Sequence, residues 1–256
     1  MAEKKAVNKV VEPTNEEIDA HVDQLVAKAQ VALSKFEEFT QEQVDYIVAK
    51  CSVAGLDAHG TLAEAAVNET GRGVFEDKAV KNLFACEYVT SNLRHLKTVG
   101  IINEDPLLGI TEIAEPVGVV CGIVPTTNPT STVIFKSLIC LKTRNPIIFS
   151  FHPSAHACSV MAAVVIRDAA IAAGAPEDCI QWLDLKSMYA TTALMKHPGV
   201  ATILATGGNA MVAAAYSCGK PALGVGAGNV PAYVEKTCVL PRAVNDIVLS
   251  KSFDNG

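Results

Sequence analysis

Short apolar segments alternate with longer segments of helical spacing from about residue 100 onward, and this alternation constrains the fold more than any other feature. The segment Val117–Val124 is almost wholly apolar, which is typical of a strand buried on both faces. Such alternation predicts an α/β fold with a doubly wound, mostly parallel sheet and crossover helices. The predicted strands are 113–116, 117–124, 146–150, 179–183, 200–205, 222–225 and 231–235. The predicted helices that alternate with them or follow them are 131–141, 155–173, 187–196, 209–217 and 240–250.

The first hundred residues carry helical patterns instead. After a leader of residues 1–13 that we expect to be disordered, Thr14 and Glu17 form a capping-box pattern, and Thr40 and Gln43 repeat it. Apolar residues at helical spacing follow both patterns. Two more helices are predicted over 58–69 and 76–95. We therefore predict an N-terminal helical segment, 1–100, and an α/β domain, 101–256; the alternative is that the two form one domain.

Composition excludes several classes of protein. Half of the 256 residues are hydrophobic and 19% are charged, so the chain can bury a core without disulfides. The net charge of −6 argues against a nucleic-acid or anionic-membrane surface. Neither a secretory signal nor a run of about 18 apolar residues is present, so we expect a soluble, cytoplasmic protein. The eight cysteines show no CxxC pair or metal-ligand spacing and are expected to be buried and reduced: Cys51, Cys86, Cys121, Cys140, Cys158, Cys179, Cys218 and Cys238.

Ligands of open parallel sheets bind at the carboxyl ends of the strands, where unusual loops follow several predicted strands. The loop Pro125–Pro129 holds Thr126, Thr127 and Asn128 between two prolines. It is interpreted as a polar shelf under a cofactor, with an Asn128 amide able to donate to an oxyanion. The alternative is a rigid turn with Thr130 or Ser131 as N-cap.

Two further loops offer weaker signals. Thr206–Asn209 places Gly207 and Gly208 at a helix start, where backbone N–H groups can approach a pyrophosphate; the alternative is a helix entry that needs positive φ. His152 follows the predicted strand 146–150 and is either a surface or packing residue or a contact for the adenosine end of a cofactor.

The stretch Gly224–Asn229 has a GxGxG spacing, but Pro231 and a predicted strand stand where a dinucleotide fingerprint needs a helix. We reject it as a Rossmann signature. It is expected to let the backbone lie close to a ligand or reacting carbon, or to form a glycine bulge. No GxSxG elbow, phosphate-binding GxxxxGK[ST] loop or carboxylate pair is present. The residues alone thus indicate a cofactor-binding α/β protein without specifying a reaction.

Five motifs in order resemble the aldehyde dehydrogenase superfamily over essentially the whole chain. The residues of these motifs are similar to those of the CoA-acylating branch, and within it to the N-terminal part of the acylating module of bacterial bifunctional aldehyde–alcohol dehydrogenases. The motifs are Glu115–Val119, the loop ending at Asn128, Thr206–Gly208, Gly224–Asn229 and Ser252–Gly256.

The resemblance implies an oxidoreductase that converts acetaldehyde, CoA and NAD reversibly to acetyl-CoA and NADH in ethanol fermentation. A cysteine thiolate adds to the aldehyde, hydride passes to NAD, and the acyl group passes to CoA. Asn128 matches the oxyanion donor; no metal is implied here, since iron belongs to the family's second module. The resemblance also implies homo-oligomers or filaments. The implied cofactor-binding residues are Ile123, Val124, Pro125, Thr126, Thr127, Asn128, His152, Thr206, Gly207, Gly208 and Gly226.

Two departures from hydrolytic relatives bear on the chemistry. Gly224–Asn229 lacks the general-base glutamate that those enzymes carry in the matching motif, which favours acyl transfer to CoA over hydrolysis. His152-Pro153 stands where many of them have a lysine for the adenosine ribose, so the choice between NAD and NADP stays open.

The resemblance places the nucleophilic cysteine immediately beyond Gly256. We therefore expect the isolated chain to bind NAD weakly at best and to lack turnover. Cys218 and Cys238 are nearest in sequence to the active-site loops, but they lie outside the family motif and are not expected to replace it. The alternatives are an assembly or interaction module without catalysis and a hydrolytic aldehyde dehydrogenase.

Overall fold

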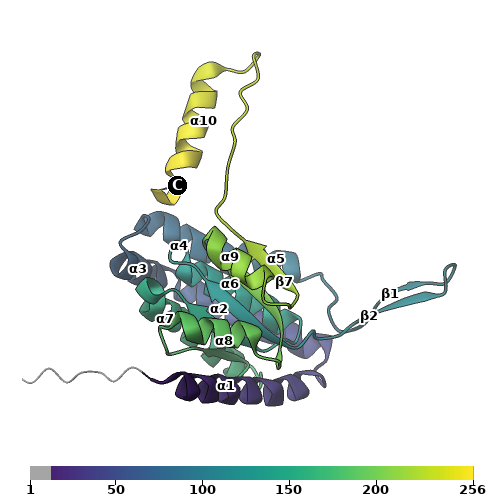
Figure 1. Cartoon of the computed structure of the whole chain (residues 1–256). Helices are drawn as coiled ribbons and strands as arrows, with labels where there is room; N and C mark the ends of the chain where they lie inside the picture. The colour runs from purple at the N-terminus through teal and green to yellow at the C-terminus, as the bar shows by residue number, and fades with distance from the viewer. Residues whose placement is uncertain (1–12, 256) are drawn as a thin grey trace, which may run out of the picture.

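The computed structural model describes residues 13–255, and a five-stranded parallel sheet with helices on both faces forms its centre (Figure 1). The strand order is β5-β4-β3-β6-β7. The predicted doubly wound α/β fold is confirmed. The strands are β3 (Val119–Val124), β4 (Ile147–Phe151), β5 (Ile180–Trp182), β6 (Val200–Thr206) and β7 (Ala222–Val225).

The helices follow the predicted order. Both predicted capping boxes are formed, by Thr14 with Glu17 and by Thr40 with Gln43. The predicted helix 76–95 is interrupted by one π-helical turn, Phe84–Tyr88. The helices are α1 (Asn15–Phe36), α2 (Gln41–Asp57), α3 (His59–Thr70), α4 (Phe75–Leu83), α5 (Val89–Leu93), α6 (Pro129–Lys142), α7 (His156–Ala172), α8 (Met188–Lys196), α9 (Asn209–Tyr216) and α10 (Leu240–Ser252).

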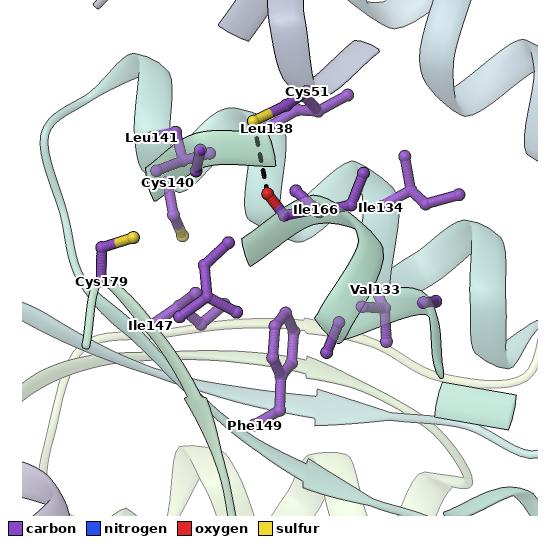
Figure 2. Close-up of a cluster of buried hydrophobic side chains, with 14 of the residues drawn as sticks. Cys51, Val133, Ile134, Leu138, Cys140, Leu141, Ile147, Phe149, Ile166 and Cys179 are labelled. Carbon is purple, nitrogen blue, oxygen red and sulfur yellow. Dashed lines mark hydrogen bonds between the residues drawn. The ribbon is translucent and has the colours of Figure 1, made fainter. Parts of the chain in front are cut away.

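Strand β3 separates two hydrophobic cores because successive side chains point to opposite faces of a sheet. Val120 and Val124 face the core formed with α2, α6 and α7, whereas Cys121 and Ile123 face the core formed with α1, α8 and α9. Figure 2 shows the first core, where the Cys51 thiol of α2 donates to a carbonyl of α7 at 3.5 Å. Every residue of β3 is buried, as its apolar run predicts.

The N-terminal helices cover both faces of this sheet. Ile18 and Val22 of α1 lie in the second core, and Ile47 and Cys51 of α2 lie in the first. The helical and α/β parts thus share their cores. Of the predicted leader, residues 1–13, the structure describes only residue 13, and residues 1–12 lie outside the described residues. The boundary proposed near residue 100 stays a prediction.

An antiparallel hairpin, absent from the predictions, lies between the helical and α/β parts in sequence and projects from the body (Figure 1). It consists of β1 (Gly100–Asp105) and β2 (Ile110–Ala114), so the predicted strand 113–116 is wrong beyond residue 114. Leu107 at its tip is 97% exposed. Sequence patterning missed β1 because apolar and polar residues do not alternate along it, and no face of the hairpin is buried.

Beyond β7 the chain leaves the sheet as an extended segment and then forms α10, which stands apart from the body in Figure 1. The predicted helix 240–250 is confirmed, but the predicted strand 231–235 is wrong. Tyr233 is 89% exposed, and no strand among residues 13–255 pairs with this segment. A strand needs such a partner for its backbone groups.

One segment, Pro153–Ala172, is long and apolar enough to cross a membrane by length and composition. In this fold it comprises a short 3-10 turn and α7. Ala162, Ala163 and Ile166 of α7 are fully buried in the first core, against α2 and α6. The apolar composition is that of a helix covering a sheet.

Candidate functional site

The carboxyl ends of β3 and β6 form the topological switch point of the sheet. The two strands are neighbours, with Ile123 opposite Ala205. The chain leaves β3 through α6 on one face, and it leaves β6 through α9 on the opposite face. A crevice opens where successive connections diverge in this way, and ligands of doubly wound sheets bind there. The loops after β3 and β6 are therefore the candidate site.

The loop after β3 ends at Asn128, which is the N-cap residue of α6 by position but makes no side-chain capping bond. Pro129 occupies the first turn, where its missing N–H costs nothing. The alternative interpretation, with Thr130 or Ser131 as N-cap, is wrong, because both residues lie inside α6. The Thr130 hydroxyl instead donates to Asn82 Oδ1 at 2.8 Å in a buried contact. Asn128 is thus left available for other partners.

A chain of hydrogen bonds joins this loop to the one after β4. Thr126 Oγ1 lies 3.2 Å from Ser154 Oγ, which lies 2.8 Å from His152 Nδ1. The Ser154 backbone N–H also donates to that ring nitrogen, at 3.2 Å. Thr126 and His152, which were predicted independently, therefore share one exposed polar edge at the carboxyl ends of neighbouring strands.

The side chains of Ile123 and Val124 lie in the two cores and are 5% and 2% exposed. Only their backbone can face a ligand. The Ile123 carbonyl accepts from Lys136 Nζ at 2.5 Å, and the Leu204 carbonyl of β6 accepts from the same nitrogen at 2.6 Å. Burial lowers the pKa of Lys136 to about 7. This buried amine ties together the two strands at the switch point.

The loop after β6 exposes backbone. Gly208 caps α9 with φ −65°, and neither Gly207 nor Gly208 has positive φ, so the helix entry does not require glycine conformations. A Cβ built on Gly208 would meet no atom within 4 Å. Nothing in the protein itself demands glycine there. Open space over the first N–H groups of a helix is what a pyrophosphate needs.

Gly224 in β7 and Gly226 just after it have a packing role. A Cβ on Gly224 would lie 2.6 Å from Val212 of α9, and one on Gly226 would lie 2.6 Å from Asn209 Oδ1. Asn209 Oδ1 also accepts from the Ala227 N–H at 3.2 Å. The close approach expected here is therefore to α9, and neither glycine has the positive φ of a G1 bulge.

A hollow of about 300 Å³ opens beside Asn128, between the turn before α4, Lys81 in the last turn of α4 and the segment after α10. Sequence reasoning missed its charged residues. Lys78 and Lys81 resemble ordinary surface charges, and only their i, i+3 spacing on α4 signals a shared face. Asp254 lies in a motif that was recognised as a whole. The residues lining the hollow are Gly71, Arg72, Gly73, Lys81, Thr127, Asn128 and Asp254.

Six of the eight cysteines are buried, as expected, whereas Cys218 is half-buried and Cys238 exposed. Burial raises the pKa of five thiols to about 12 and that of Cys51 further. A thiol with such a pKa holds almost no thiolate near neutral pH and is a poor nucleophile. The buried cysteines are therefore structural. Among residues 13–255, no group of three His, Cys, Asp or Glu side chains is arranged to hold a metal ion.

The fold and this switch point define a doubly wound α/β protein with a polar loop and a glycine-rich helix start at its ligand crevice. The profile of the aldehyde dehydrogenase family matches residues 3–256, and the chain belongs to that family. It is 72% identical over 241 residues to aldehyde-alcohol dehydrogenase 2 of Entamoeba histolytica, covering 93% of this chain. It is 70% identical to the aldehyde-alcohol dehydrogenase of Streptococcus pneumoniae, covering 100% of this chain. The chain spans 28% and 29% of the length of these two relatives.

Solved structures agree with this assignment. An acetylating aldehyde dehydrogenase from Geobacillus thermoglucosidasius superposes with a TM-score of 0.91 at 47% identity, covering 95% of this chain and 54% of that one. A propionaldehyde dehydrogenase from Rhodopseudomonas palustris, solved with bound CoA and an acylated cysteine, gives 0.80 at 33% identity, covering 91% and 53%. An engineered glycolyl-CoA reductase with bound NADP+ gives 0.80 at 34% identity, with the same coverage. The predicted likeness to the CoA-acylating branch is confirmed.

Proposed function

We propose that this chain forms the nucleotide-binding part of a CoA-acylating acetaldehyde dehydrogenase that uses NAD. The observation that carries the proposal is the switch point. The open backbone at Gly208 and the polar loop ending at Asn128 follow adjacent strands, so one ligand can contact both. The relatives named above, which include acetylating enzymes and one structure with a dinucleotide, support this assignment.

The residues fit a dinucleotide in a specific way. The first N–H groups of α9 and the space over Gly208 suit the pyrophosphate. His152, held by Ser154, suits the adenosine end, and the loop Pro125–Asn128 suits the nicotinamide end. Bound NAD would accept a hydride in this chemistry, and these residues of the chain would hold it in place.

Asn128 supplies the electrostatic part of the chemistry. When a cysteine thiolate adds to the aldehyde carbon, negative charge develops on the former carbonyl oxygen. The Asn128 amide donates to that oxygen and stabilises the charge. Transfer of the hydride to bound NAD would leave a thioester, and CoA, after its thiol gives its proton to solvent, would attack as the thiolate and release the cysteine thiolate. The stretch Gly224–Asn229 holds no carboxylate to activate water, so the thioester passes to CoA.

A hybrid enzyme tests this function directly. Residues 1–256 replace the matching part of the Streptococcus pneumoniae relative, and acetaldehyde oxidation is followed by nicotinamide absorbance with and without CoA. We expect CoA-dependent turnover with NAD, and Asn128→Ala should lower kcat by about 10²–10³-fold. The control Asn68→Ala, on the exposed face of α3, should change nothing. Acetate formation without CoA would favour a hydrolytic enzyme, and turnover with NADP alone would overturn the nucleotide choice.

Association with further copies is a second proposal, supported by exposed apolar side chains. Leu107 and Leu108 of the hairpin are 97% and 71% exposed, and Val248 and Leu249 of α10 are also exposed. Apolar groups gathered on projecting elements mark interaction surfaces. Sedimentation of the chain should show concentration-dependent oligomers that Leu107→Asp weakens. A monomer at all concentrations would contradict this proposal.

A further inference from the structure

The side chain of Asn128 is oriented by a charge network that reaches it from α4. Lys81 Nζ donates to Asn128 Oδ1 at 3.0 Å. An ammonium group has only donors, so the amide atom facing it must be the oxygen. The amide nitrogen of Asn128 therefore points away from Lys81, and among residues 13–255 it donates to no partner. This is the atom that the proposed function requires.

Lys81 is itself held by Asp254. The Asp254 carboxylate accepts from Lys81 at 2.7 Å, from Lys78 at 3.2 Å and from the Val74 N–H at 3.0 Å. Burial raises the pKa of Asp254, but the hydrogen bonds from Lys81, Val74 and Lys78 outweigh this effect and lower it. The carboxylate therefore stays charged. Lys78 also donates to the Thr127 carbonyl at 2.7 Å, so the network holds both the backbone and the side chain of the loop.

The residues around Asp254 leave space for its carboxylate and fix its backbone. Gly73 has φ +79°, and a Cβ there would lie 2.0 Å from Asp254 Oδ1. Asp254 itself has φ +52°, a conformation that costs free energy for a residue other than glycine. Its backbone N–H donates to Asp77 Oδ2 at 2.8 Å. No larger side chain fits at Gly73, and Asp254 holds a strained backbone conformation. Both observations indicate that the contact between these two residues is specific.

We propose that Lys81, anchored by Asp254, is a positioning residue that holds the Asn128 amide with its nitrogen free for the substrate oxyanion. This inference rests on the proposed function for its catalytic half only. Orientation of the amide is a property of the chain itself. It also makes Asp254 couple the segment after α10 to the loop after β3, although the two are 126 residues apart in sequence (254 − 128).

Nuclear magnetic resonance of the asparagine-labelled chain tests the orientation. The Asn128 side-chain signal is assigned by its loss in Asn128→Ala. We expect Lys81→Met to shift this signal, Lys81→Arg to restore it because arginine also only donates, and the exposed control Lys28→Met to leave it unchanged. An unchanged signal in Lys81→Met would overturn the proposal. If Lys81→Met does not fold, Asp254→Asn, which releases Lys81, gives the same test.

Kinetics of the hybrid enzyme separate this inference from the proposed function. Lys81→Met should lower kcat roughly tenfold with little change in the KM for NAD, and Lys81→Arg should recover most of the loss. A shifted signal with an unaltered kcat overturns the positioning role, provided that Asn128→Ala shows its expected loss of kcat. If Asn128→Ala is equally active, the proposed oxyanion role is wrong, and the catalytic half of this inference falls with it.

Discussion

The loops after β3 and β6 end neighbouring strands, yet they are built in opposite ways. The loop after β3 is fixed by charged side chains from α4 and by the prolines around Asn128. The loop after β6 has open backbone at Gly208. A side chain that must stabilise a developing charge has to be held in one orientation, whereas a phosphate site needs free N–H groups and space. The difference therefore assigns chemistry to one loop and binding to the other.

The largest effect on stability is expected near the loop after β3, which charged side chains hold in place. Gly73→Ala would force a Cβ into the Asp254 carboxylate at a positive φ. We expect a loss of about 3 kcal/mol in unfolding free energy, from backbone strain and a disturbed buried ion pair. Urea unfolding measures it. Gly71→Ala is the matched control, because Gly71 has φ +62° but open space, so only strain of about 1 kcal/mol applies. Equal losses in both variants would show that the contact between Gly73 and the Asp254 carboxylate contributes nothing to the unfolding free energy.

A pH effect comes next, at the amine that ties the two strands together. Burial lowers the pKa of Lys136 from 10.5 to about 7. Between these values the unfolded chain keeps a proton that the folded chain has lost, so the free-energy cost that Lys136 imposes on folding falls as pH rises through that interval. Relative to Lys136→Met, wild-type stability should rise by about 2 kcal/mol between pH 7 and 9.

Urea unfolding of both proteins across that pH range provides the measurement, and Lys50→Met on α2 serves as a control with an exposed lysine. A constant difference between wild type and Lys136→Met would show that Lys136 stays protonated in the folded chain. The two carbonyls of β3 and β6 would then stabilise its charge more than burial opposes it.

The smallest effect on stability is expected in the loop after β6, where the backbone at Gly208 is open. Gly208→Ala places its Cβ in free space at φ −65°, so the unfolding free energy should change by no more than about 0.5 kcal/mol. Thermal and urea unfolding check this. A loss as large as that in Gly73→Ala would mean that Gly208 serves packing, and the contrast between the two loops would disappear.

Patterning predicted the sheet well because its central strands β3 and β4 are buried on both faces, so apolar runs such as Val117–Val124 mark them clearly. It failed where tertiary pairing decides, at the exposed hairpin β1–β2 and at the unpaired segment 231–235. The site showed the same division. Thr126, Asn128 and Gly208 stand in loops of unusual composition, whereas the contacts of Lys81 and Asp254 depend on helix α4 meeting the end of the chain. The predicted cytoplasmic location stays a prediction.

Binding of NAD to the chain, measured by calorimetry for the wild type and Gly208→Val, tests the central claim most directly. We predict weak but saturable binding by the wild type. Gly208→Val, whose side chain enters the space over the start of α9, should abolish binding while unfolding remains nearly unchanged. Equal affinity in the two proteins, or no binding by a folded wild type, would contradict the assignment of this switch point as the nucleotide site.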